Sequence, residues 1–110
     1  MRYRELGNTG MKVSVIGLGG VQLASSETEY AVKIVRKALE LGVNYFDTAR
    51  VYGDSEVKVG IALKGERERV YISTKTTRRT KEEAWQHIRE SLHRLTASIR
   101  DIPRFVINIT

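Results

Sequence analysis

Two short stretches decide the fold of this chain: residues 44–56 read NYFDTARVYGDSE, and residues 70–75 read VYISTK. An apolar run ends at an ionisable residue in each, at Asp47 in the first and at Lys75 in the second. Tyr52 follows Asp47 in a predicted turn. We expect both runs to be parallel strands of one α/β sheet, whose carboxyl ends meet at the rim where such sheets carry their chemistry. The pattern therefore predicts a site made by Asp47, Tyr52 and Lys75.

Strand and helix patterns alternate on both sides of these stretches. Apolar runs at residues 15–20, 43–46 and 70–74 predict buried strands, and each is followed by a helical pattern. Residues 3–15 predict an antiparallel hairpin around a turn that contains glycine. Buried strands joined by helices predict right-handed βαβ units around a parallel sheet, in either an open sheet or a closed barrel.

The open sheet that binds dinucleotides is the less favoured of these two arrangements. Its fingerprint requires a third glycine after Gly17 and Gly19, and Gln22 occupies the place of that glycine. We therefore expect strands arranged as in a barrel.

The predicted helices have recognisable ends and apolar faces. The first begins at a capping box of Ser26 with Glu29, and the third begins at a box of Thr80 with Glu83. Gly42 stands where a left-handed residue ends the first helix. The positions expected to face the core are Ala31, Ile34, Val35, Ala38 and Leu41 in the first helix, Val57 and Ile61 in the second, and Ala84, Ile88, Leu92 and Leu95 in the third.

The composition predicts one cytoplasmic domain over residues 1–110. The chain has no cysteine, which excludes a disulfide framework, a thiolate zinc site and a cysteine nucleophile. We find no signal peptide and no run of membrane-spanning length, so no membrane partner is expected. The net charge is +6, but acidic residues lie among the basic ones of residues 64–104. A solvated basic face is therefore favoured over nucleic-acid binding.

The pattern DTAxxYGxSE at residues 47–56, together with STK at residues 73–75, resembles the aldo-keto reductases. The resemblance begins in the hairpin with YRELGxTG at residues 3–10 and continues to ESLxRL at residues 90–95. Members of that family are (β/α)8 barrels. The resemblance thus implies a partial TIM barrel in an α/β fold, with the N-terminal β-hairpin, about three β/α units and parallel strands.

The resemblance also implies an activity, the reduction of aldehydes and ketones to alcohols with NADPH rather than NADH and without a metal. Tyr52 would be the general acid, Lys75 would lower its pKa, and Asp47 would hold Lys75 charged. A phenol with a pKa near 10 is a poor acid at neutral pH, and a nearby ammonium favours its ionised form. The expected partner is a small-molecule carbonyl substrate.

The same resemblance places a cofactor beside the end of the first strand. Gly20, Val21 and Gln22 match the segment that lies near the nicotinamide in the family, and Asp47 belongs to the same cofactor-binding set. Each residue also has a structural alternative, since a glycine-rich strand end is a common turn and Asp47 can cap a turn. Tyr52 and Lys75 taken singly can be ordinary surface residues, but the joint pattern favours the catalytic interpretation.

The sequence departs from the family pattern after Leu95. The family carries a histidine at the end of the fourth strand, and an ungapped register places Val106 there. His87 and His93 fall on the third predicted helix, where we expect surface positions. Residues 96–110 are expected to be a divergent tail of a truncated or frameshifted reading frame, although the run at 105–109 is compatible with a strand.

A chain of this length supplies little more than three of the eight units of a barrel, which needs about 250 residues. An unclosed sheet exposes two edges and an apolar inner face. The alternative to an enzyme is therefore a catalytically inactive fragment that acts as an interaction module and self-associates through its open sheet edges.

Overall fold

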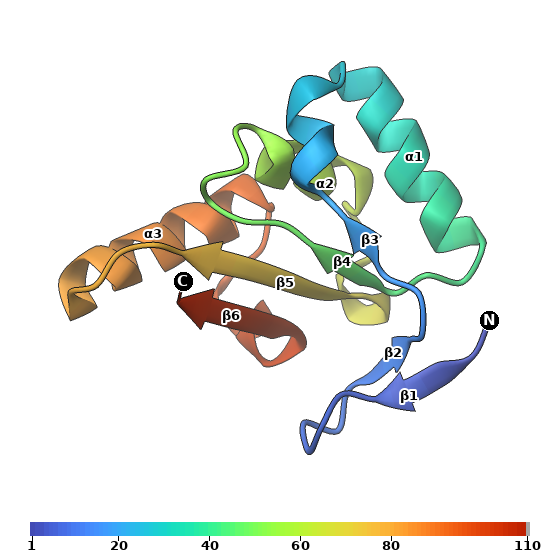
Figure 1. Cartoon of the computed structure of the whole chain (residues 1–110), viewed down its shortest axis with the longest axis horizontal. Helices are drawn as coiled ribbons and strands as arrows, with labels where there is room; N and C mark the ends of the chain where they lie inside the picture. The colour runs from blue at the N-terminus through green and yellow to red at the C-terminus, as the bar shows by residue number, and fades with distance from the viewer. Residues whose placement is uncertain (110) are drawn as a thin grey trace.

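A four-stranded parallel sheet in the order β3-β4-β5-β6 forms the centre of the molecule (Figure 1). The structure is a computed structural model and describes residues 1–109. The strands of this sheet are β3 (Leu18–Gly19), β4 (Tyr45–Asp47), β5 (Tyr71–Thr76) and β6 (Phe105–Ile109). Each strand lies beside the one that precedes it in the chain, as the alternation of strand and helix predicted.

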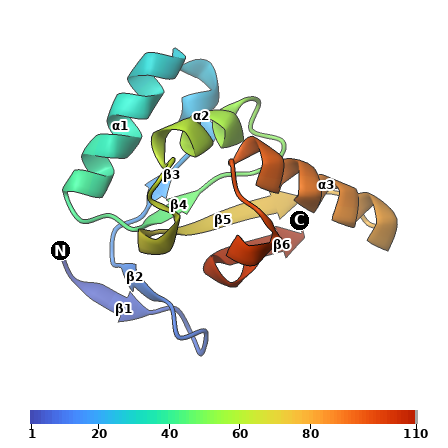
Figure 2. The same cartoon turned by 180° about the vertical axis from the view of Figure 1, so that it is seen from behind.

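Three α-helices cover one face of this sheet, and a hairpin lies apart at the end where the strands begin (Figures 1 and 2). The helices are α1 (Thr28–Glu40), α2 (Ser55–Ala62) and α3 (Lys81–Arg94), with short 3-10 helices η1 (Val21–Ser25), η2 (Arg67–Arg69) and η3 (Ile99–Arg104). The hairpin pairs β1 (Tyr3–Glu5) with β2 (Lys12–Ser14) in antiparallel register. This arrangement confirms a partial (β/α) barrel. Within residues 1–109, no helix is both long enough and apolar enough to cross a membrane.

The hydrophobic core lies between the sheet and the helices. Phe46 of β4 and Ile72 of β5 are each 1% exposed and pack with Val35 of α1, Val59 of α2 and Leu92 of α3. Because side chains alternate along a strand, the neighbours of these core residues point to the opposite face of the sheet. That opposite face carries the ionisable residues of interest.

Two helix ends follow the sequence prediction, and one does not. Gly42 is left-handed with φ +98°. The Glu83 amide donates to the Thr80 hydroxyl at 3.2 Å, which is the N-cap half of the predicted box. The predicted box of Ser26 with Glu29 is absent. The Ser26 hydroxyl instead donates to the Gln22 carbonyl at 3.2 Å, so it serves η1 and is not available to α1.

Some predicted apolar positions are exposed because their surroundings differ from the expectation. The stretch 15–20 was expected to be one buried strand, but only Leu18–Gly19 pairs, and Ile16 is 61% exposed where the chain crosses from hairpin to sheet. Between the hairpin and the sheet lies a hollow with a volume of about 590 Å³. Leu41, at the end of α1, is 63% exposed.

Helix α2 buries a different face from the one its apolar residues indicated. Val57 is partly exposed and Ile61 is 46% exposed, whereas Val59 and Ala62 are each 1% exposed. The helix packs on α1, η1 and α3, so more than one of its faces is covered.

The tail contains the anticipated strand, but Val106 is the second residue of β6 and does not lie at the end of that strand, where the ungapped register placed it. In the pairing of β5 with β6, Val106 lies opposite Ser73 and Asn108 lies opposite Lys75. Asn108, not Val106, is therefore the neighbour of Lys75 on the next strand. Thr110, the last residue of the predicted tail, lies outside the described residues.

Candidate functional site

Asp47 and Lys75 meet at the carboxyl ends of β4 and β5. In the parallel register Asp47 lies opposite Ser73, so Lys75 is two residues further along and points to the same face. The Lys75 ammonium donates to the two carboxylate oxygens of Asp47 at 2.8 and 2.9 Å and to the Thr48 carbonyl at 2.8 Å. The structure thus brings these two predicted residues into direct contact.

The charge state of Lys75 follows from these contacts. Burial alone would lower the pKa of Lys75, but the hydrogen bond and the negative charge of Asp47, with Tyr52 adding to them, outweigh it and raise that pKa above 10.5. The side chain of Lys75 is 21% exposed. Lys75 is therefore a partly buried ammonium throughout the neutral range.

Tyr52 reaches the same place from the loop that follows β4. Its ring centroid lies 5.0 Å from the Lys75 ammonium. The loop closes through two backbone bonds, from the Tyr52 amide to the Ala49 carbonyl at 3.1 Å and from the Ser55 amide to the Tyr52 carbonyl at 2.9 Å. Gly53 is left-handed with φ +51°, a conformation that glycine adopts at little cost. All three predicted catalytic residues are thus neighbours.

Helix α3 holds this loop from one side. The Arg50 guanidinium donates to the Glu90 carboxylate at 3.0 Å, and Arg94 donates to the Gly53 carbonyl at 2.6 Å. Arg94 also donates to Glu56 at 3.2 Å, and the second carboxylate oxygen of Glu56 accepts a 2.7 Å bond from Thr74. Glu56 is fully buried, so its charge is balanced inside the protein.

Sequence reasoning did not assign roles to these residues, since a glutamate after a serine at a helix start indicates only a favourable N-terminal charge. The signal that could have found the ion pair is the match of Glu56 and Arg94 to two quoted motifs of the same family.

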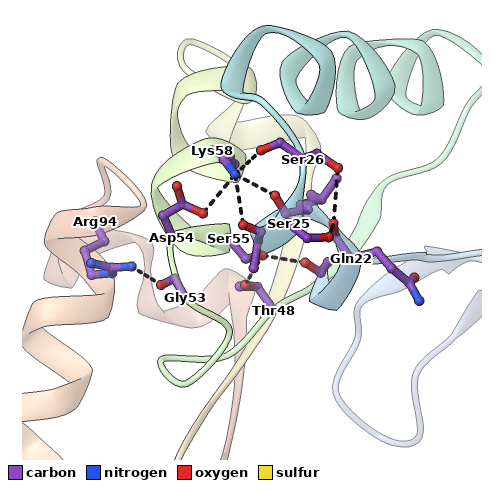
Figure 3. A network of polar contacts seen from close by, with 12 residues as sticks. Gln22, Ser25, Ser26, Thr48, Gly53, Asp54, Ser55, Lys58 and Arg94 are labelled. Atoms are coloured by element: carbon purple, nitrogen blue, oxygen red, sulfur yellow. Dashed lines mark hydrogen bonds and ion pairs between the residues drawn. The ribbon is translucent and has the colours of Figure 1, made fainter.

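Helix α2 holds the predicted cofactor segment from the other side (Figure 3). The Ser55 hydroxyl contacts the Gly20 carbonyl at 2.8 Å and the Thr48 hydroxyl at 2.8 Å, which joins the end of β3 to the end of β4. Val21 is 53% exposed. Gln22 is also exposed, and its side chain points away from this network (Figure 3).

The two histidines lie on α3, as predicted, and they differ in exposure. His93 is exposed, whereas His87 is partly buried: its Nδ1 lies 3.0 Å from the Thr76 hydroxyl, and its Nε2 accepts from Arg78 at 3.2 Å. His87 is covered on one side because α3 folds back over the end of β5. Neither histidine contacts Asp47, Tyr52 or Lys75.

The geometry offers one chemical capability. A carboxylate fixes an ammonium, and the ammonium lies beside a phenol on a half-open rim. A fixed ammonium close to a phenol on an accessible rim is an arrangement that proton-transfer sites use.

The comparison with known proteins identifies one family. The model of the Aldo/keto reductase family matches residues 15–102, beyond the point at which the motif resemblance ended. L-galactose dehydrogenase from Arabidopsis thaliana is 39% identical in an alignment that covers 93% of this chain and 37% of that protein.

Solved structures agree with this match. An aldo-keto reductase from Bacillus halodurans in its holo form is 34% identical, with a TM-score of 0.74 over 88% of this chain and 37% of that one. An aldo-keto reductase from Klebsiella pneumoniae in complex with NADPH is 30% identical, with a TM-score of 0.68 over 78% of this chain and 32% of that one. The chain therefore spans less than two fifths of the length of these proteins.

Proposed function

This chain belongs to the aldo/keto reductase family, and we propose that Asp47, Tyr52 and Lys75 carry the proton-transfer part of a reduction of an aldehyde or ketone to an alcohol. The observation that supports the proposal is the position of the Lys75 ammonium. It lies 2.8 Å from the Asp47 carboxylate and 5.0 Å from the centroid of the Tyr52 ring. The proposed substrate is a small carbonyl compound.

In this proposal the Tyr52 hydroxyl donates its proton to the carbonyl oxygen, which gains negative charge during the reduction. A phenol at its ordinary pKa near 10 is a weak acid at neutral pH, so its proton transfer requires a group that stabilises the phenolate. In the proposal, the Lys75 ammonium stabilises the phenolate that remains after the transfer. Asp47 keeps Lys75 charged and fixes the direction in which the ammonium points.

We propose NADPH as the reductant, with NADH less favoured, because the Klebsiella pneumoniae relative was solved with NADPH. When bound, NADPH supplies the hydride. The residues present fit the nicotinamide end of this cofactor, since Gln22 exposes an amide and Val21 exposes an apolar side chain at the strand ends. Asp47 adds a carboxylate that accepts hydrogen bonds. Gly20, Val21, Gln22 and Asp47 would therefore hold that end.

The first test replaces Tyr52 with phenylalanine and measures the reduction of a panel of small aldehydes and ketones with NADPH. Loss of the proton donor is expected to lower kcat by about 10²–10⁴-fold and to leave the fold unchanged by circular dichroism. Tyr30→Phe is the matched control, because Tyr30 is 62% exposed on α1 and lies outside the site. Equal rates for Tyr52→Phe and the wild type would refute the role of Tyr52.

An interaction module is the second candidate function, because the sheet has open edges. Within residues 1–109, β3 and β6 each pair on one side only. Ile16 and Ile109 lie near these two edges, and each is 61% exposed. Apolar residues beside an unpaired strand favour pairing with a second copy of the chain. A mass that rises with concentration in analytical ultracentrifugation would support self-association, and a monomer at every concentration would contradict it.

A further inference from the structure

Lys58 of α2 is a buried lysine whose ammonium is enclosed by oxygen atoms. Its side chain is only 4% exposed. The ammonium donates to the Leu23 carbonyl at 2.7 Å and to the Ser26 carbonyl, and the Ala24 carbonyl lies at 3.4 Å. Asp54, one helical turn earlier, supplies a carboxylate oxygen at 2.9 Å. These four oxygens form what we call the Lys58 cage (Figure 3).

The cage matches the chemistry of an ammonium. A lysine has three N–H donors and no acceptor, and its surroundings present only acceptors. The three carbonyls belong to the last turn of η1 and the residue after it, where a helix leaves carbonyls without helical partners. Of the three, the Leu23 carbonyl also accepts the Ser26 amide at 3.2 Å. A buried charge is tolerated when it is paired and hydrogen bonded, and Asp54 provides the pairing charge.

The segment whose carbonyls form the cage follows directly on residues that sheet pairing does not fix. Strand β3 ends at Gly19, so Gly20, Val21 and Gln22 lie beyond the last strand pair. Their backbone is instead held by α2, through Ser55 on the Gly20 carbonyl and through Lys58 on the carbonyls that follow Gln22. Ser55 and Lys58 are three residues apart and therefore lie on one face of the helix.

We propose that Lys58 is a positioning residue for the nicotinamide end of the cofactor, because it fixes the turn that presents Val21 and Gln22. The inference rests on the proposed function, in which this turn contacts NADPH. Lys58 itself touches neither cofactor nor substrate, since its ammonium is enclosed on the inner side of η1. Its effect passes through the backbone of residues 21–26.

The test replaces Lys58 with methionine, which keeps the length of the side chain and removes its donors. The carbonyls of the cage then lose their shared partner and η1 is expected to loosen. We expect the dissociation constant for NADPH, measured by calorimetry, to rise about tenfold or more. We also expect amide hydrogens of residues 21–26 to exchange at least about tenfold faster, while those of residues 71–76 remain unchanged.

Leu92→Ala is the matched control for a general loss of stability. Leu92 is 4% exposed on α3, and its loss destabilises the core without touching the cage. It should lower Tm but leave NADPH affinity and the exchange of residues 21–26 unchanged. If Lys58→Met behaves in the same way as Leu92→Ala, then Lys58 is only a stabilising residue and the proposal is overturned.

Lys58→Gln keeps the test decisive if the methionine variant does not fold, because its amide retains two N–H donors for the cage. An intermediate loss of affinity, with faster exchange confined to residues 21–26, supports the proposal, and wild-type values for both refute it. Failure of the wild type to bind NADPH would count against the proposed function, whereas unchanged exchange of residues 21–26 would count against the role of Lys58.

Discussion

The two sides of the site are built by different means. Asp47 and Lys75 stand on paired strands, so the register of β4 with β5 places them without help from elsewhere. Gly20 and Gln22 follow a strand of only two residues, and side chains of α2 hold the segment at the carbonyls of Gly20 and Leu23. Backbone pairing is therefore enough to place a site residue on a strand. An irregular segment is positioned by residues elsewhere in the sequence, and of these Ser55 belongs to the quoted motif whereas Lys58 does not.

The Tyr52 loop lies between these two regions and depends on both. The first residue of the loop continues the backbone pairing of β4 with β5, since the Thr48 amide donates to the Ser73 carbonyl at 2.7 Å. Its end is held by side chains, with Ser55 on one side and Arg94 on the other. Substitutions at the supporting positions should therefore separate stability from chemistry.

The largest effect on stability is expected from Glu56→Ala, which removes the buried carboxylate between β5 and α3. Arg94 and Thr74 then lose a shared acceptor, and breaking a buried ion pair typically costs about 3–5 kcal/mol. Urea unfolding followed by circular dichroism measures the loss. Glu56→Gln keeps an oxygen for Thr74 and should lose less; equal stability of the alanine variant and the wild type would show that the ion pair does not hold the loop.

A smaller effect is expected from Gly20→Ala, which tests how closely the ends of β3 and β4 approach. A Cβ at this position would lie 2.6 Å from the Asp47 carbonyl and 2.8 Å from the Ser55 hydroxyl, so one of the two must move. Overpacking of this kind costs about 1–3 kcal/mol.

Gly19→Ala is the control for this substitution, because a Cβ there meets nothing within 4 Å. Thermal unfolding of both variants makes the comparison. If they lose the same stability, the close approach at Gly20 is not the cause.

The smallest effect is expected for Asp54→Asn, which should change how the free energy of unfolding depends on pH. The hydrogen bond from Lys58, opposed by partial burial, lowers the pKa of Asp54 below its usual 3.8 in the folded chain. A lowered pKa stabilises the fold at pH values above 3.8, and this contribution is lost as pH falls through the folded pKa.

The stability difference between wild type and Asp54→Asn should therefore shrink from about pH 5 downward, as measured by urea unfolding at a series of pH values. Glu40→Gln, which changes an exposed pair on α1, should show no such trend. A difference that stays constant down to about pH 2 would mean that Asp54 is not coupled to Lys58.

The sequence allowed the sheet and the meeting of Asp47 with Lys75 at its edge to be predicted, because both depend on local patterns. Apolar runs that end at Asp47 and Lys75 indicate parallel strands, and parallel strands put their ends together. Gly42 and Thr80 marked helix ends because each has a backbone requirement that few residues meet.

Other features depend on contacts between distant segments, and no local pattern reports them. Ser26 looked like a helix cap but bonds Gln22, because η1 ends beside it. No pattern in the sequence singled out Lys58, and it is buried by a segment more than thirty residues earlier. The contact of His87 with Thr76 was not predicted, because it exists only once α3 folds back over β5.

The order β3-β4-β5-β6 bears on how the chain folds. Each strand pairs with the next strand in the sequence, so every pairing closes a loop of one helical crossover and none waits for a distant segment. Each crossover must close before its strands can pair, and the sequential order allows each unit to add to the one already formed. Residues 1–109 can therefore assemble in the direction of synthesis, with β3 and α1 as the first template and β6 as the last strand to join.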